Sequence, residues 1–94
     1  MNINEVRSHK DEIIALAEQA GVTNLRIFGS VARGDEKENS DVDFLATVMK
    51  GSGLKFIGLQ LQLQELLKCK VDLVSDKGLN KYIAESILQE AISL

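Results

Sequence analysis

The run DVDFLATV, from Asp41 to Val48, constrains the fold of this chain more than any other stretch. Its two acids alternate with Val42 and Phe44, and an uninterrupted apolar segment follows. This is the pattern of a β-strand whose far end is buried on both faces. The run therefore predicts a strand in the core, with two carboxylates at the point where it enters.

Helical periodicity and short strand-like runs alternate along the rest of the chain. Residues 4–20 carry a helical apolar stripe, with Asn4 as a candidate N-cap and Gly21 as a candidate left-handed C-cap. The segment LQLQLQ within residues 54–68 has the period of a strand, but its leucines also fit one helical face, and Gln, Glu and Leu favour a helix. The predicted order is helix 4–20, strand 24–29, one helical turn, strand 41–48, helix 54–68, strand 70–75 and helix 79–92.

The chain length and composition fit one folded domain. With 94 residues, the chain has room for a single hydrophobic core over residues 1–94. Hydrophobic residues make up 45% and charged residues 27%, which is an ordinary globular balance and argues against disorder. Strands separated by helices give a mixed or parallel sheet. We therefore expect an α/β (α+β) domain with a small mixed sheet of three or four strands and helices packed against it.

Charge and cysteine content narrow the classes of function. The net charge is −3 and no basic block stands out, so direct binding to nucleic acid is not expected. The single cysteine, Cys69, excludes an internal disulfide and the spacing of a zinc site, and it favours a reducing compartment. The N-terminal region lacks the apolar core of a signal peptide, and no apolar run has the length of a membrane span. We expect a soluble cytoplasmic protein with no membrane partner.

Asp41 and Asp43 form the first candidate site. Side chains at i and i+2 of a strand project to the same face, about 7 Å apart along the chain. Two such carboxylates repel each other and are costly to bury without a counter-charge. Mg²⁺ prefers hard oxygen ligands, typically one or two carboxylates completed by substrate phosphates. The pair therefore predicts a magnesium site.

Gly29 and Ser30 lie where the preceding strand turns into a helix start. Glycine permits close backbone approach, a serine hydroxyl can donate to a phosphate oxygen, and the N–H groups of a helix N-terminus favour an anion. Arg33 is either a further phosphate contact or a structural ion-pair partner. These residues predict a phosphate-binding turn beside the two acids, as in a site for a Mg²⁺–nucleoside triphosphate.

Asp72 is a third candidate, because it interrupts the apolar strand VDLV. Beside the first two acids it can share a metal ion and accept the proton of an attacking hydroxyl. Three acids on neighbouring strands match two-metal phosphoryl transfer, in which one ion activates the nucleophile and the other holds the triphosphate.

The motif GS, ten intervening residues and then DVD resembles the signature of the nucleotidyltransferase superfamily related to DNA polymerase beta. The stretch FGSVARGDEKENSDVDFLATV is similar to its smallest branch, the minimal nucleotidyltransferases (MNT), and so are LLKCKVDLVS and LNKYIAESILQEAI, which extends the resemblance over nearly the whole chain. The resemblance implies the nucleotidyltransferase fold. It also implies nucleotide binding by Gly29 and Ser30, metal ligation by Asp41, Asp43 and Asp72, and a role for Asp72 as general base.

The sequence departs from the family pattern at three places. Many members have Arg at the position of Val31 and Asp at the position of Asn39. Members also often continue past the last helix into a short strand, whereas this chain stops at ISL. The three acids are untouched, so these departures leave the site in place and the edge of the sheet open.

The resemblance also implies a protein partner. Relatives that modify antibiotics or RNA carry a further helical domain for the acceptor, which this chain lacks, so another polypeptide is expected to hold the acceptor or to be it. Minimal nucleotidyltransferases are commonly the antitoxins of HEPN-domain ribonuclease toxins, to which they transfer AMP from ATP with Mg²⁺. Two alternatives stay open. The chain could neutralise its partner by contact with a vestigial or regulatory nucleotide site, or serve a small molecule held by a separate helical chain.

Three further features have ordinary structural explanations. Cys69 lies at a helix-to-strand junction, and packing explains it better than nucleophilic chemistry. Tyr82 is expected to be a half-buried helix residue rather than an acceptor for self-modification. The leucines of residues 54–67 are expected in the core, and any exposed remainder offers a partner surface or a homo-oligomer surface.

Overall fold

A four-stranded sheet in the order β3-β2-β1-β4 organises the chain, in a computed structural model that describes residues 1–94. β1 is antiparallel to β2 and β4, whereas β2 and β3 are parallel. The expected small mixed sheet with packed helices is confirmed. The strands are β1 Val22–Phe28, β2 Val42–Val48, β3 Val71–Ser75 and β4 Ile92–Ser93. The helices are α1 Ile3–Arg7, α2 Lys10–Gln19, α3 Gly29–Arg33, α4 Gly53–Leu67 and α5 Lys81–Glu90, with a 3₁₀ turn η1 at Asp76–Gly78.

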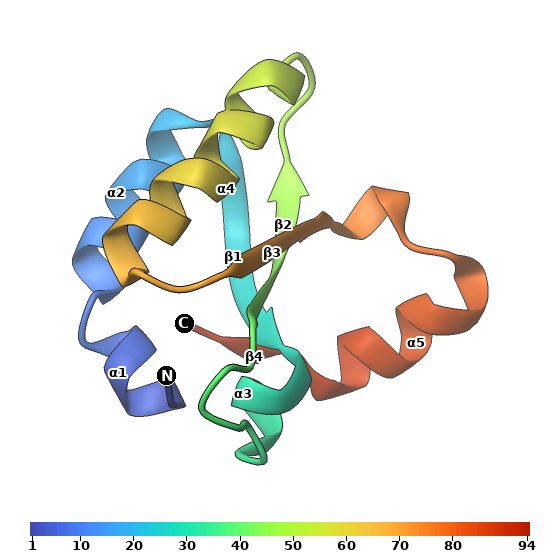
Figure 1. Cartoon of the computed structure of the whole chain (residues 1–94). Helices are drawn as coiled ribbons and strands as arrows, with labels where there is room; N and C mark the ends of the chain where they lie inside the picture. Colours follow the sequence, from blue (N-terminus) through green and yellow to red (C-terminus); the bar gives the residue numbers. More distant parts are fainter.

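The two faces of the sheet differ in what covers them. Val42, Phe44 and Ala46 of β2 are fully buried in the main core, which also contains the inward side chains of α2 and α4. Figure 1 shows α2 and α4 side by side over one face, while α5 stands apart from them on the other side of the strands. Because side chains alternate along a strand, Asp43 and Thr47 project to the face opposite α2 and α4. The acids therefore lie on the less covered face.

The segment LQLQLQ is helical, as predicted, and its glutamines support the sheet. Gln60 and Gln64 are one turn apart on α4, and their Oε1 atoms accept hydrogen bonds from the backbone N–H groups of Leu73 and Val71 at 3.1 and 3.2 Å. β3 is an edge strand. The two glutamines therefore pair donors that the sheet leaves without a strand partner.

Replacing Gln64 with alanine is expected to lower the free energy of unfolding by about 1 kcal/mol, because the half-buried N–H of Val71 loses its acceptor. Urea unfolding followed by circular dichroism measures the change. The matched control is Gln62→Ala on the same helix, since Gln62 is exposed and makes no side-chain hydrogen bond in the structure. Equal stability changes in the two variants would contradict the role given to Gln64.

The N-terminal helix predicted over residues 4–20 is wrong in one respect, because it is two helices. α1 starts two residues earlier than expected, since Asn2, not Asn4, is the N-cap and forms a capping box with Glu5. The hydroxyl of Ser8 donates to the carbonyl of Glu5 and competes with helix continuation, so α1 ends before α2 starts at Lys10.

The start of β1 and the C-terminal residues also differ from expectation. β1 starts at Val22, two residues before the predicted strand. Its pairing with β2 shifts register between Thr23 and Arg26, where Asn24 has φ +50°. At the C-terminus, the sequence ISL supplies the short strand that the sequence analysis left open. β4 pairs antiparallel with β1 at Ile27 and Ile92.

A partly buried polar cluster fixes the connection from β3 to α5. The Thr47 hydroxyl donates to Oδ2 of Asp76 at 2.7 Å, and Nη2 of Arg26 lies 3.5 Å from the same oxygen. These contacts hold η1 against the face of the sheet that carries the acids. Among the helices, none is both long and apolar enough for a membrane crossing.

Candidate active site

Asp43 and Asp72 form the centre of the candidate site. They are direct register partners on the parallel strands β2 and β3, so their side chains project from the same face of the sheet. Neighbouring strands lie about 4.8 Å apart, which brings the two carboxylates side by side. The structure thus unites one predicted acid from the DVD motif with the acid of VDLV.

The electrostatic environment of Asp43 is strongly negative. Desolvation, followed by the charges of Asp72, Asp41 and Glu90, raises the pKa of Asp43 to about 6, while the charge of Arg33 opposes this rise. A carboxyl group with several acidic neighbours and partial burial favours a bound cation or a proton. This environment is typical of a functional site rather than of a solvated strand end.

The raised pKa of Asp43 predicts a pH-dependent stability in metal-free protein. Between its ordinary value of 3.8 and about 6, folded Asp43 holds a proton that the unfolded chain has released. The contribution of Asp43 to the free energy of unfolding is therefore lost as pH rises through this window. We expect Asp43→Asn to be more stable than the wild type above pH 6 by about 1 kcal/mol, after allowance for solvent screening, and to gain little at pH 4. Urea titrations at several pH values test this, and a pH-independent difference would contradict it.

Asp41 lies just before β2, beside the central pair. Its Oδ2 atom is 4.0 Å from Nζ of Lys70, and its side chain is 39% exposed. An ion pair this long and exposed contributes little to stability, so it holds Asp41 only weakly. In this structure no set of three or more His, Cys, Asp or Glu side chains is arranged to hold a metal ion by itself. The donor chemistry of Asp43 and Asp72 nevertheless fits Mg²⁺, which takes one or two carboxylates and fills its remaining positions with phosphates and water.

Gly29 brings the phosphate-binding turn into contact with the acids. It has φ +77°, and a Cβ atom at this position would overlap Oδ2 of Asp43. The turn needs glycine for its left-handed backbone and for the close approach to the carboxylate. Ser30 follows in the first turn of α3, and the N-cap residue Phe28 provides no side-chain cap. The first N–H groups of α3 thus lack a side-chain partner beside the carboxylate pair.

Arg33 forms ion pairs in the structure. Its Nε lies 3.1 Å from Oδ2 of Asp35, and its Nη1 lies 2.6 Å from Oε1 of Glu90. The hydrogen bond that Arg33 donates to Asp35 is the main reason why the pKa of Arg33 is raised. Glu90 was not a sequence candidate, and no local motif points to it, since it reaches the site only because α5 returns to α3.

Two other residues can now be placed. Cys69 is half-buried and packs against the core, and burial raises the pKa of its thiol, which agrees with a packing role. The expectation for Tyr82 is wrong, because it is 92% exposed. Tyr82 follows the N-cap Asn80 at the outer end of α5, where no other element covers the helix.

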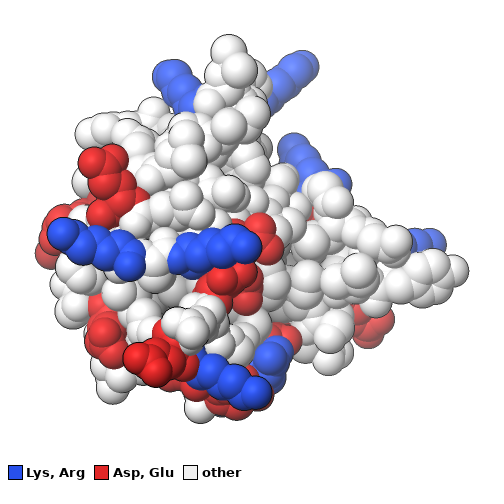
Figure 2. All heavy atoms as spheres, in the orientation of Figure 1, with Lys and Arg blue, Asp and Glu red and all other residues white.

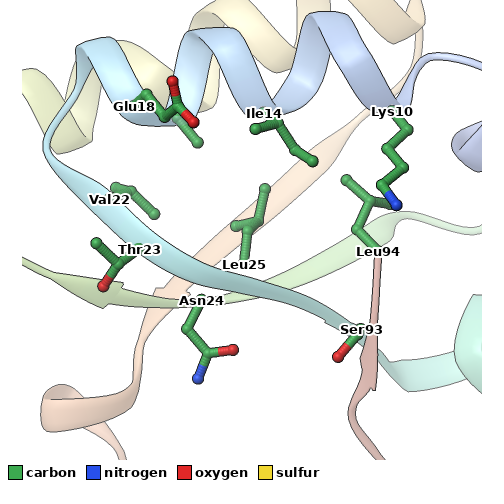
Figure 3. A pocket seen from close by; sticks show the side chains of 10 residues that line it. Lys10, Ile14, Glu18, Val22, Thr23, Asn24, Leu25, Ser93 and Leu94 are labelled. Carbon is green, nitrogen blue, oxygen red and sulfur yellow. The ribbon is translucent and has the colours of Figure 1, made fainter.

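An apolar hollow of the chain lies elsewhere. A cavity of about 450 Å³ is lined by residues of α2, the first half of β1 and the C-terminus. Figure 3 shows Ile14, Leu25 and Leu94 pointing into it, with the amine of Lys10 beside Leu94. None of the candidate site residues lines this cavity. The candidate site residues therefore lie apart from this cavity, with the acids on the less covered face of the sheet.

Comparison with known proteins agrees with the fold. The family described as "Nucleotidyltransferase domain" matches residues 6–94, so the chain belongs to this family of nucleotidyltransferases. A relative from Thermococcus cleftensis named "Protein adenylyltransferase MntA" is 40% identical over 97 aligned residues, which cover 98% of this chain and 95% of the relative. A solved structure of a provisionally assigned minimal nucleotidyltransferase is 38% identical and superposes with a TM-score of 0.89, covering 100% of this chain and 97% of the other.

A more distant solved complex shares the fold alone. It contains a tri-AMPylated HEPN toxin of Shewanella oneidensis with an MNT antitoxin, and the matched chain is 16% identical with a TM-score of 0.67. The alignment covers 93% of this chain and 69% of the matched chain. The suspected nucleotidyltransferase family and fold are thus confirmed.

Proposed function

We propose that this chain transfers AMP from ATP to a hydroxyl group of a partner protein. The observation that carries the proposal is the contact between Gly29, in the turn before α3, and Asp43, which is paired in register with Asp72. A phosphate-binding turn and a carboxylate pair thereby form one site. The similarity to a protein adenylyltransferase at 40% identity supports adenylyl as the group and protein as the acceptor.

In the proposed reaction, the acceptor oxygen attacks the α-phosphorus of ATP. An O–P bond forms, the bond between the α-phosphorus and its bridging oxygen breaks, and pyrophosphate leaves. Asp72 accepts the proton of the hydroxyl, because its carboxylate is exposed at the edge strand beside Asp43. Gly29 and Ser30 present backbone N–H groups to the phosphates. Asp43 and Asp72, with Asp41 at the strand entrance, would hold Mg²⁺, which supplies charge neutralisation for the phosphates.

We further propose that the partner is a HEPN-domain toxin and that the chain is its antitoxin. The shared fold with an MNT antitoxin bound to an AMPylated HEPN toxin supports this pairing. The test mixes the chain, ATP, Mg²⁺ and the product of the neighbouring gene, which is expected to be the HEPN-domain toxin, and then measures the ribonuclease activity of that product. Loss of ribonuclease activity that requires ATP supports the proposal, whereas equal loss without ATP favours neutralisation by contact.

A further inference from the structure

Helix α5 carries an apolar strip that nothing in the chain fully covers. By helical spacing the strip consists of Ile83, Ala84, Ile87, Leu88 and Ala91. No residue of α5 is buried, and Ile83 and Leu88 are 53% and 49% exposed. Figure 2 shows that the visible surface over α5 is largely free of charged side chains. An amphipathic helix normally buries its apolar side, so this strip is free to bind a partner.

The C-terminal end of the strip lies near Glu90, which connects α5 to the acids. Ile83, Ile87 and Glu90 are spaced i, i+4 and i+7, so they follow one line along α5. At the inner end of this line, Oε1 of Glu90 lies 2.6 Å from Nη1 of Arg33, and the charge of Glu90 acts on Asp43. Ile83 lies seven residues away, about 10 Å along the helix axis. The line therefore runs from the acid pair outward along α5.

We propose that the apolar strip of α5 is the docking surface for the acceptor protein. It would hold an apolar segment of that protein while the hydroxyl that receives the nucleotide reaches the acids beyond Glu90. This inference rests on the proposed function, because transfer to a protein requires the acceptor to touch the surface that borders Asp43 and Asp72. Glu90 connects the inner end of the strip to that surface.

The second exposed apolar surface cannot serve the same purpose. Leu54, Ile57 and Leu61 on α4 are 88%, 64% and 62% exposed. However, α4 packs on the face of the sheet opposite to the acids, so a segment bound there cannot reach them. This surface supplies a matched control, since Ile57 and Ile83 are the same residue type and their side chains are 64% and 53% exposed.

The test compares Ile83→Asp and Leu88→Asp with the control Ile57→Asp. The acceptor is the product of the neighbouring gene, expected to be a HEPN-domain protein. The readouts are its AMP incorporation by intact mass, its affinity for the chain and the affinity of the chain for ATP. We expect at least a tenfold loss of kcat/KM for the acceptor in both α5 variants, mainly through KM. ATP affinity should stay unchanged, and Ile57→Asp should remain within twofold of the wild type.

Several outcomes would overturn the inference. Both α5 variants could stay within twofold of the wild type, or Ile57→Asp alone could lose the acceptor. A wild-type dimer that Ile83→Asp dissociates, with acceptor modification unchanged, would make the strip a contact between two copies. If the wild type transfers no AMP, the proposed function fails, and the binding affinities of the same variants still decide whether α5 is the docking surface.

Discussion

The double variant Asp41→Ala/Asp43→Ala is expected to lose nucleotidyl transfer by a factor of about 10³ or more and to keep its affinity for the partner protein. The two substitutions remove one member of the central carboxylate pair and the acid at the entrance of β2. Without them, only Asp72 remains to hold the divalent cation that would neutralise the phosphates. Single-turnover assays with ATP, followed by intact mass of the partner, measure the loss.

The control for this prediction is Asp11→Ala/Glu12→Ala, which makes the same change of charge on the exposed first turn of α2. It is expected to transfer AMP within twofold of the wild type. The partner affinity separates two mechanisms. If the double acid variant still neutralises a toxin as fully as the wild type does, the chain acts by contact and its nucleotide site is not required.

Gly29→Ala is expected to lower transfer at least about 100-fold. The new methyl group would overlap Oδ2 of Asp43, and a non-glycine residue at φ +77° adds about 1–2 kcal/mol of backbone strain. The Asp43 carboxylate must then move away from the position that it shares with Asp72. A displacement of about 1 Å at a reacting centre is enough for a loss of this size.

Gly34→Ala is the matched control for Gly29→Ala. Gly34 has φ +80°, so its replacement carries a similar backbone strain, but no atom lies within 4 Å of the added Cβ. We expect both variants to lose a similar amount of thermal stability and only Gly29→Ala to lose transfer. Equal losses of transfer would mean that strain, and not contact with Asp43, explains the need for glycine.

The sequence predicted the parts of the site that come from local patterns. The DVD motif, the glycine turn and VDLV each identify their residues by a short local pattern. The structure places Gly29, Asp43 and Asp72 together. Their register could not be predicted, because it depends on how α4 returns β3 beside β2. Strand pairing of Asp43 with Asp72 is a property of the sheet and leaves no mark in either segment.

The features that the sequence analysis missed have different physical origins. Glu90 reaches Arg33 over 57 positions of sequence, so no motif contains both residues. The helix break at Ser8 comes from one hydroxyl that bonds to the Glu5 carbonyl, a competition that periodicity does not detect. Tyr82 was expected to be half-buried because α5 is amphipathic, but that expectation assumed that α5 packs closely on the sheet.

The central claim is that the carboxylates and the glycine turn make this chain a protein adenylyltransferase. Its most direct test is the intact mass of the neighbouring gene's product, the expected HEPN-domain partner, measured after incubation with the chain, ATP and Mg²⁺. The account predicts a mass increase by whole AMP units that disappears when Asp41 and Asp43 are both replaced. An unchanged mass for a partner that the wild-type chain demonstrably binds would contradict it.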